Sequence, residues 1–484
     1  MFDTEQEKRR IEKLKKLKER GIEPYPYSFN ITHKTKDIIN NFERLNKSET
    51  QVNTAGRVTA IREHGKTTFL NINDVDGKIQ VYFRKDVIGD KKYDILKLLD
   101  IGDFIGVRGS VFKTHTGEIT ILVNDYELLA KALHPLPEKW HGLQDKEERY
   151  RKRWLDLLMN QEVKVTFLQR TELINKIRQF LNARGFVEVD TPTLQPLYGG
   201  AFAKPFKAHY DALDRDFYLR ISDELYLKRL IIGGFEKVYE ICKDFRNEGM
   251  DRFHNPEFTM LELYEAYKDY YYLMDLVEEL FDWLLLEIKG KRELEFDGKR
   301  VEFKRPWNRL PFFKALEEFV GRDLRHTGRE ELLSLATELD ISLPSNVPKG
   351  KIWDTIFDKL VQPNIIEPTF VIDYPKDVSP LTKQKRDDPD LVERFEPIIF
   401  GIEIGNAFSE LNDPLEQYER FKQQEKFRKE GESEAQVLDE DFISALEIGM
   451  PPTAGLGLGI DRIVMMFTNS HSIKDVIMFP QMRV

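Results

Sequence analysis

A stretch from residue 236 to 264 combines a guanidinium group, carboxylates, an aromatic ring and a phenol. Two runs within it, 236–246 and 258–264, alternate like β-strands around a polar loop, so the simplest interpretation is an antiparallel hairpin. Because strand side chains alternate between two faces, the pairing register could gather five of these groups on one surface. They are Arg246 and Glu248 on one face of the first strand, and Phe258, Glu262 and Tyr264 on one face of the second.

Such a surface suits a nucleotide and an amino acid. A guanidinium binds a phosphate or a carboxylate through a forked contact, and an aromatic ring stacks on a base. Arg246 is the candidate for the first contact and Phe258 for the second. The residue types alone also allow an ordinary surface hairpin that carries ion pairs.

Two further carboxylates, Glu396 and Glu403, flank a short apolar run. A tight turn near residues 399–401 would bring them close together, where they would repel each other in the absence of a cation. Carboxylate oxygens are hard ligands that suit Mg²⁺. Two acids at this separation are also common without any shared function, so both interpretations stay open.

These residues need a scaffold, and the chain divides into regions of different pattern. We expect a basic helical segment over 1–50, a barrel over 51–130, a connector over 131–160 and a large domain over 161–484. Within the large domain, residues from about 270 to 368 read as a helical insertion without a chemical motif, and we assign them to packing. The fold class is α+β.

The barrel is predicted from five short alternating runs between residues 52 and 129, separated by turn residues. This pattern is typical of a five-stranded Greek-key barrel of the OB type, which often binds single-stranded nucleic acid. Phe69, Tyr82 and Phe83 would either stack on bases or fill the barrel core, and strand periodicity does not decide between these positions.

The N-terminal segment repeats Ile11, Leu14 and Leu17 at helical spacing until Gly21 and Pro24 end the pattern. Its many lysines and arginines favour a solvated helix face over a nucleic-acid site, because the whole chain has a net charge of -10.

Composition excludes several classes of protein. The single cysteine, Cys242, excludes an intrachain disulfide and a thiolate-rich metal site. The N-terminus has no continuous apolar core like that of a signal peptide, and no apolar run reaches membrane-spanning length. We therefore expect a soluble cytoplasmic protein.

Three motifs resemble those of a known enzyme class. FRNEGMDRFHNPEFTMLELY, from residue 245, is similar to motif 2 of class II aminoacyl-tRNA synthetases, and HNPEFTMLE is close to its lysine-specific form. Residues 181–192 resemble motif 1, whose strand supports a dimer interface. Residues 455–462 resemble motif 3; their glycines recur at every second position, which differs from a dinucleotide-binding turn.

The resemblance to class II lysyl-tRNA synthetases of subclass IIb implies a function. We expect a catalytic domain built on an antiparallel sheet flanked by helices, preceded by an OB-fold that binds the anticodon. The implied reaction is the ATP-dependent attachment of L-lysine to tRNA(Lys) through lysyl-adenylate, which releases AMP and diphosphate. Up to three Mg²⁺ ions, a homodimer formed through motif 1 and a cytoplasmic location are also implied.

The resemblance assigns roles residue by residue. The catalytic residues are Arg246 and Arg462. ATP would bind Arg246, Glu248, His254, Asn255, Phe258, Glu396, Gly457 and Arg462. Lysine would bind Gly200, Glu224, Arg246, Glu262, Tyr264, Asn406, Phe408 and Glu410. The metal ligands would be Glu396 and Glu403, within the family-like runs RFEP and GIEIGNAFSELND. The anticodon would contact Phe69, Gln80 and Glu118.

One position departs from the family pattern. Phe253 stands directly before His-Asn-Pro, where bacterial members commonly have arginine, and Arg252 precedes it, so the residue that meets the γ-phosphate is not assigned. Two alternative functions remain. One is that of a paralogue that attaches lysine to a protein such as elongation factor P, and such a paralogue would lack the barrel. The other is that of a non-catalytic relative, which would not need Arg246 and Arg462. Aspartyl- and asparaginyl-tRNA synthetases have different residues around the position of Glu224, so we prefer lysine to aspartate and asparagine as the amino-acid substrate.

Overall fold

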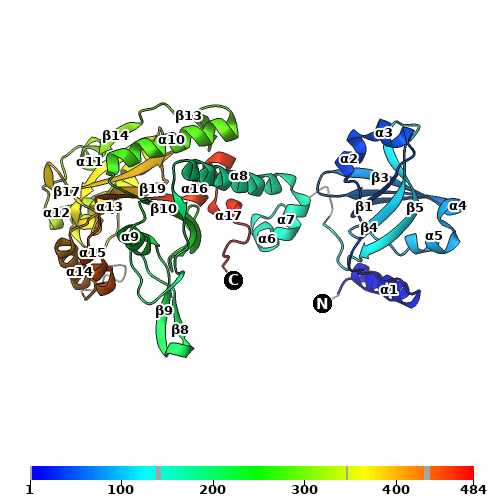
Figure 1. The fold of residues 1–484 in the computed structure, drawn as a ribbon, viewed down its shortest axis with the longest axis horizontal. Helices are drawn as coiled ribbons and strands as arrows, with labels where there is room; N and C mark the ends of the chain where they lie inside the picture. The colour runs from blue at the N-terminus through cyan, green and yellow to red at the C-terminus, as the bar shows by residue number, and fades with distance from the viewer. Residues whose placement is uncertain (1–2, 138–142, 345–346, 430–435, 484) are drawn as a thin grey trace. The chain divides into compact units, whose positions relative to one another are not determined.

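The computed structural model describes residues 3–137, 143–344, 347–429 and 436–483. The chain folds as two units, residues 1–142 and 143–484 (Figure 1). No described helix has both the length and the apolar character needed to cross a membrane.

Unit 1 contains the predicted five-stranded barrel, which is closed in the order β1-β2-β3-β5-β4. The strands are β1 (Gln51–His64), β2 (Thr67–Asn73), β3 (Lys78–Arg84), β4 (Phe104–Lys113) and β5 (Ile119–Ala130). Two short helices, α4 (Lys85–Ile88) and α5 (Asp90–Leu96), lie between β3 and β4. The inward side chains of the strands form one buried apolar cluster, so the OB-type prediction is confirmed.

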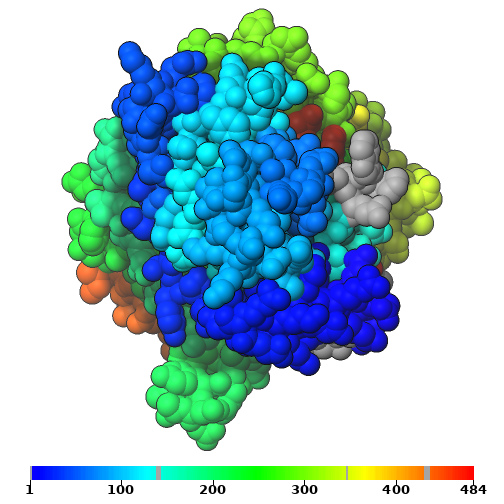
Figure 2. Space-filling model, turned by 90° about the vertical axis from the view of Figure 1, so that its right-hand side faces the viewer, coloured from blue at the N-terminus to red at the C-terminus, as the bar shows by residue number. Residues whose placement is uncertain are grey.

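Helix α1 (Glu5–Glu19) confirms the helical N-terminal segment, and α2 (Thr35–Asn40) and α3 (Phe42–Lys47) follow it. A capping box between Thr4 and Glu7 begins α1. Leu17 is fully buried in the barrel cluster, and the Arg10 guanidinium donates to the carbonyl of Ile101. Figure 2 shows α1, in dark blue, lying against the surface of the barrel. Most of its basic side chains are exposed, as expected of a solvated helix face.

Unit 2 is built on a ten-stranded sheet whose main path is β14-β15-β17-β19-β20-β11-β10-β6, with β16 and β18 paired to β17. Its pairs are antiparallel apart from β6–β10 and β14–β15. The strands are β6 (Val187–Glu188), β10 (Lys237–Phe245), β11 (Glu257–Ala266), β14 (Asn308–Pro311), β15 (Thr369–Pro375), β16 (Gln384–Lys385), β17 (Asp388–Ile399), β18 (Ile402–Glu403), β19 (Gly405–Ser409) and β20 (Thr453–Gly459).

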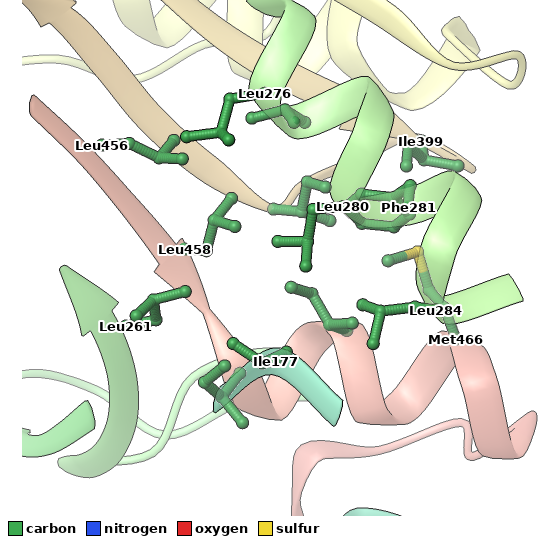
Figure 3. Packing of buried hydrophobic residues seen from close by; sticks show 14 of the residues in the cluster. Ile177, Leu261, Leu276, Leu280, Phe281, Leu284, Ile399, Leu456, Leu458 and Met466 are labelled. Atoms are coloured by element: carbon green, nitrogen blue, oxygen red, sulfur yellow. The ribbon is translucent and has the colours of Figure 1, made fainter. Parts of the chain in front are cut away.

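The core of unit 2 lies on one face of this sheet, under α8 (Gln161–Ala183), α10 (Tyr270–Lys289) and α16 (Ile460–Thr468). Figure 3 shows Ile177, Leu280 and Met466 from these helices packing toward Leu261 and Leu458 of the sheet. The opposite face of β10 and β11 carries an apolar cluster with α9 (Glu224–Ile232), α14 (Pro414–Lys429) and α15 (Glu440–Ile448).

Two predicted regions differ from the structure. The proposed connector, 131–160, contains α6 (Lys146–Arg151) and α7 (Arg153–Met159), which belong to unit 2 because buried Arg153 donates to the carbonyl of Met478. The proposed helical insertion, 270–368, begins with the core helix α10 and contributes the edge strand β14. Its other elements are β12 (Glu293–Phe296), β13 (Lys299–Glu302), α11 (Phe312–Val320), α12 (Arg329–Glu338) and α13 (Lys349–Ile356).

The remaining elements are short. A three-stranded sheet of β7 (Leu194–Gln195), β9 (Arg215–Leu219) and β8 (Lys207–Tyr210) includes a hairpin that projects from the body of unit 2 (Figure 1). Single helical turns occur at Asp211–Leu213, Gln362–Asn364 and Lys376–Val378, a π-helical turn at Phe357–Val361, and α17 (Ile473–Val476) lies near the C-terminus.

Candidate active site

The predicted hairpin exists, and its register places Asp244 opposite Phe258 and Glu240 opposite Glu262. Directly opposed residues point to the same side of a sheet, so Phe258, Glu262 and Tyr264 share the face that is turned away from the main core. One detail is corrected: β10 ends at Phe245, so Arg246 and Glu248 lie in the following loop. The backbone N–H of Arg246 still donates to Pro256 at 2.9 Å, which keeps its side chain beside the same face.

A cavity of about 500 Å³ opens on this face of the sheet. It brings together nearly all the residues that the resemblance assigns to ATP, lysine and metal. They are Gly200, Glu224, Arg246, Glu248, His254, Asn255, Phe258, Glu262, Tyr264, Glu396, Glu403, Asn406, Phe408, Gly457 and Arg462. The exception is Glu410, which is almost fully buried behind this lining.

One end of the cavity is cationic and aromatic. The Arg246 guanidinium lies 5.1 Å from the centroid of the Phe258 ring. Arg462 donates to the Glu403 carboxylate at 3.0 Å, and its second nitrogen lies 3.0 Å from His254 Nε2. Because His254 Nδ1 lies 2.7 Å from the Asp251 carboxylate, the arrangement fits a histidine protonated at Nδ1 that accepts at Nε2.

The loop at Arg252 and Phe253 is now placed. The Arg252 guanidinium donates to the carbonyl of His471 at 2.5 Å and to Asp297 at 3.1 Å. Phe253 and His254 line the cavity, whereas Arg252 is held away from it by these contacts. The departure from the family pattern therefore leaves an aromatic ring, and no guanidinium, at this point of the wall.

The glycines of β20 make room for the cavity and its lining. Gly457 pairs with Glu262 and Gly455 pairs with Tyr264 across the sheet. A Cβ atom at Gly455 would collide with Glu410 Oε1 and with the Tyr264 ring, and one at Gly457 would lie 3.2 Å from the Met260 side chain. A side chain is thus excluded at residue 455, and one at residue 457 would require the Met260 side chain to shift.

The other end of the cavity is anionic. Glu262 accepts hydrogen bonds from Ser222 and from the Tyr264 hydroxyl, both at 3.1 Å. Burial, reinforced by the nearby carboxylates Asp244 and Glu224, raises the pKa of Glu262 to about 8. Carboxylate oxygens of Asp223, Asp244 and Glu262 all lie within 4.8 Å of one another, and sequence reasoning did not single out Asp223 or Asp244.

Glu224 and Glu410 lie on either side of an internal lysine that sequence reasoning also missed. The ammonium group of Lys228 contacts Glu224 Oε1 at 2.5 Å and contacts Glu410 Oε2. Lys228 is one helical turn beyond Glu224 on α9, a spacing that could have indicated the first contact. The contact with Glu410 joins residues that are distant in the sequence, so no local sequence pattern indicates it.

The slot between the two ends has one polar and one aromatic wall. Asn406 and Phe408 share a face of β19, and both line the cavity. Asn406 Oδ1 accepts from Arg394 at 2.8 Å, and Arg394 also contacts Glu396 at 2.5 Å. Gly200 has a φ of +88°, a conformation that favours glycine. A Cβ atom there would lie 2.8 Å from the Ser222 hydroxyl and 3.2 Å from the Cβ atom of Glu224, so the backbone of Gly200 approaches Glu224 closely.

The predicted turn between the two metal candidates is confirmed. Residues Phe400 and Gly401 have φ values of +56° and +75°, and they join β17 to β18 with Ile398 opposite Glu403. This pairing places Glu396 and Glu403 on one face of the β-ribbon. Burial raises the pKa of Glu396 to about 7, and Glu403 adds to that rise.

Three charged cavity residues come from the region that we assigned to packing. Lys351 and Asp354 on α13, and Asp358 in the turn after it, line the cavity. Burial raises the pKa of Asp354, and Glu403 adds to the rise while Arg394 opposes it. The apolar side of this helix packs into a core cluster, as assigned, but the assignment overlooked its charged side, because apolar periodicity reports only the buried face of a helix.

The barrel presents its own candidate face. The rings of Phe69 and Tyr82 stack at a centroid distance of 4.3 Å on the partly exposed side of β2 and β3, whereas Phe83 is fully buried in the core. Gln80 donates to Glu118 at 3.0 Å. The alternative left open by periodicity is resolved: Phe69 and Tyr82 are surface rings, and Phe83 is a core residue.

Comparisons with known proteins agree with this architecture. Residues 145–483 match the family model of class II tRNA synthetases (D, K and N), and residues 52–129 match the OB-fold nucleic acid binding domain. A lysine–tRNA ligase of Thermoanaerobacter pseudethanolicus is 52% identical over 98% of this chain and 95% of its own length. Lysine–tRNA ligases of Carboxydothermus hydrogenoformans and Thermosipho africanus are 51% and 48% identical over 98% of this chain, and over 97% and 95% of their own lengths. The chain belongs to the lysine–tRNA ligase family of class II tRNA synthetases.

Proposed function

We propose that this protein attaches L-lysine to tRNA(Lys) with ATP, through lysyl-adenylate, and releases AMP and diphosphate. The observation that carries the proposal is the polarity of one cavity. Its anionic end, with Glu224, Glu262 and Tyr264, suits an ammonium-bearing amino acid, and its other end, with Phe258 and Arg462, suits a nucleotide. Arg246 lies next to Phe258, where the two substrates would meet.

In the first step, the carboxylate of lysine attacks the α-phosphorus of ATP. A bond from the carboxylate oxygen to phosphorus forms, and the bond from phosphorus to the diphosphate oxygen breaks. Arg246 neutralises charge on the lysine carboxylate and the α-phosphate, and Arg462 does so on the leaving diphosphate. Phe258 holds the adenine by stacking, and His254, Asn255, Glu248 and the backbone at Gly457 complete the ATP site.

Lysine selection follows from the anionic end. Glu224 binds the α-ammonium next to the exposed backbone of Gly200, and Glu410 with Tyr264 binds the side-chain ammonium. In the described part of the chain neither oxygen of the buried Glu410 carboxylate makes a hydrogen bond of ordinary geometry, and only Oε2 forms an ion pair, so Oε1 is free to accept from the substrate. Asn406 and Phe408 form the walls of the slot. A neutral side chain would leave the charge uncompensated, so it is rejected.

Magnesium fits the carboxylates of Glu396 and Glu403. Burial raises the pKa of Glu396 and repulsion from Glu403 adds to the rise, although Arg394 contacts Glu396 and opposes it, so a further cation would stabilise the two carboxylates. Asp354 adds a third carboxylate to the same wall, which is compatible with more than one ion and with up to three. When bound, the ions would neutralise phosphate charge and orient the triphosphate.

In the second step, a hydroxyl of the terminal ribose of tRNA attacks the carbonyl carbon of lysyl-adenylate. An ester bond to the ribose forms, the bond from the carbonyl carbon to the phosphate oxygen breaks, and AMP leaves with that oxygen while its phosphate takes up the proton of the attacking hydroxyl. Positioning supplies most of the rate, and no side chain of the cavity has to act as a base. Phe69, Gln80 and Glu118 contact the anticodon on the barrel, where stacking on Phe69 is favoured by its exposure.

A homodimer formed through the motif 1 region is part of the proposal. Val187, Leu194 and Leu197 are apolar side chains that are more than 40% exposed on this part of unit 2. Burial of these exposed apolar side chains against a partner would remove them from water. Sedimentation of the purified protein at twice the chain mass tests this. We also infer a cytoplasmic location, where tRNA is charged for protein synthesis.

The direct test of function is charging of purified tRNA(Lys) with labelled lysine in the presence of ATP and Mg²⁺. We expect label in acid-precipitable tRNA that depends on all three substrates. Label that instead enters a protein acceptor, or no incorporation into tRNA, would contradict the proposal.

A further inference from the structure

Lys228 is one of the most deeply buried charged groups of unit 2. Its side chain has no exposed surface, and the rings of Phe408 and Phe442 lie 5.5 and 6.0 Å from its ammonium nitrogen. Moving an ammonium group from water into such an apolar cluster costs several kcal/mol unless it is paired. Its partners are Glu224 and Glu410, which are the two carboxylates that the proposed function assigns to the substrate's ammonium groups.

The two oxygens of the Glu410 carboxylate have different surroundings. Among the described residues neither oxygen makes a hydrogen bond of ordinary geometry, but Oε2 forms an ion pair with Lys228, whereas Oε1 forms none. Oε1 lies beside the Tyr264 ring, at the point where a Cβ atom of Gly455 would collide with it. A carboxylate held from one side by an internal ammonium thus directs its free oxygen toward the lining of the cavity.

The charges of these side chains and of the substrate lysine also favour an ionised Glu410 beside Lys228. With both carboxylates ionised, the trio of Glu224, Glu410 and Lys228 carries a net charge of minus one. Lysine, with two ammonium groups and one carboxylate, carries plus one, so lysine and this trio together are neutral. Burial raises the pKa of Glu410 well above its usual range, and Lys228 opposes that rise. Without Lys228, two buried carboxylates would face each other, and at least one would take up a proton.

Resting on the proposed function, we infer that Lys228 is a positioning and specificity-determining residue, which keeps Glu410 ionised and aims its free oxygen at the side-chain ammonium of the substrate. It acts through Glu410 and does not itself touch the substrate. The consequence is that a buried residue outside the cavity lining sets both the affinity for lysine and the rejection of side chains that lack the ammonium group.

The test compares Lys228→Met, which keeps most of the length of the side chain and removes its charge, with the parent protein in ATP–diphosphate exchange. We expect the KM for lysine to rise at least about tenfold, the scale of one lost charged contact, with the KM for ATP within about twofold. Discrimination against norleucine, which lacks the ammonium group, should fall. Lys228→Arg, which keeps a cation, should recover part of the lysine affinity.

The pH profile separates charge from structure. The titratable and charged groups around Lys228 and Glu410 are Glu224 on α9, Glu262 and Tyr264 on β11, and Arg394 on β17. In Lys228→Met, Glu410 ionises only at higher pH, so the ratio of variant to parent lysine KM should fall between pH 6 and about pH 9. A ratio that is constant over this range would overturn the inference.

Lys131→Met is the matched control, because Lys131 is an equally buried lysine that pairs with two carboxylates, Asp100 at 2.5 Å and Asp103 at 2.9 Å, in the barrel. It should lower the melting temperature and leave the lysine KM in exchange unchanged. An equal rise of lysine KM in both variants would mean that Lys228 is only structural.

A double variant keeps the inference testable if Lys228→Met folds poorly. Lys228→Met/Glu410→Gln removes one charge of each sign, and its lysine KM should be no higher than that of Glu410→Gln alone, since Lys228 acts through Glu410. Additive increases would contradict this dependence. Absence of lysine-dependent exchange in the parent protein would instead contradict the proposed function, so the two failures are distinguishable.

Discussion

The guanidinium carbon of Arg246 lies 5.1 Å from the centroid of the Phe258 ring, although the two residues stand at opposite ends of the loop that joins β10 to β11. The two ends of the loop therefore lie close together, and Arg246 and Phe258 present a cation and an aromatic ring at one rim of the cavity. This pairing follows from the register of the hairpin, because Asp244 lies opposite Phe258 and the chain continues directly to Arg246.

Phe258→Leu should weaken ATP use while it spares lysine use. Stacking of a base on an aromatic ring contributes about 1–3 kcal/mol, so we expect the KM for ATP in diphosphate exchange to rise roughly tenfold or more. The KM for lysine should change less than about twofold. Equal rises for both substrates would mean that Phe258 supports the cavity as a whole and does not hold the adenine.

Glu410→Gln should weaken lysine use far more than ATP binding, because an amide cannot balance a buried ammonium. We expect the lysine KM to rise by about two orders of magnitude, the scale of a lost buried charge pair. Glu278→Gln is the control: Glu278 is a buried carboxylate paired with Arg305 in the core, and its loss should lower the melting temperature alone. An unchanged lysine KM in Glu410→Gln would show that Glu410 does not bind the side-chain ammonium of lysine.

Phe69→Ala should impair charging of tRNA and leave adenylate formation intact, because the ring lies on the barrel and not in the catalytic cavity. A loss of about tenfold in kcat/KM for tRNA is expected from one lost stacking contact. Phe83→Leu tests the core ring of the same barrel, and we expect reduced stability with normal charging below its melting temperature. Equal losses in exchange and charging would make Phe69 a structural residue.

The raised pKa of Glu262, about 8, predicts a pH dependence of stability. In the unfolded chain this carboxyl group titrates near its model value of 4.5, so between the two values the folded state binds more protons. The contribution of Glu262 to the free energy of unfolding is therefore fully present below pH 4.5 and is lost as pH rises toward 8. The melting temperature of the parent, relative to Glu262→Gln, should fall between pH 5 and about pH 8. A constant difference would contradict the raised pKa.

Glu403→Gln should raise the Mg²⁺ concentration that gives half-maximal exchange, since one of the two proposed ligands loses its charge. Glu367→Gln replaces an exposed acid of the same domain and should leave that concentration unchanged. If both variants respond to Mg²⁺ like the parent, Glu403 is not a metal ligand.

Local patterns predicted much of this molecule. Alternating runs located the five barrel strands, and the two sides of the hairpin were found because strand periodicity separates Tyr264 from Leu263. The turn at Phe400 and Gly401 was predicted from two flanking carboxylates. The role of the loop residues came from resemblance, since composition alone allows an ordinary surface hairpin.

The missed features depend on contacts between distant segments. Nothing near Lys228 indicates that Glu410 lies against its ammonium, because the pair forms only when α9 packs beside the end of β19. Asp354 was overlooked because the apolar side of α13 explained the helix without its polar side. Periodicity likewise could not decide between Phe83 and Tyr82 as core residues until the barrel had closed.

The most direct test of the central claim is ATP–diphosphate exchange by the purified protein with each of the standard amino acids in turn. We expect Mg²⁺-dependent exchange with lysine, and exchange with every other amino acid lower by orders of magnitude, because the anionic end of the cavity requires a side-chain ammonium at a set distance. Exchange driven best by aspartate, asparagine or any other amino acid, or no exchange with lysine, would contradict it.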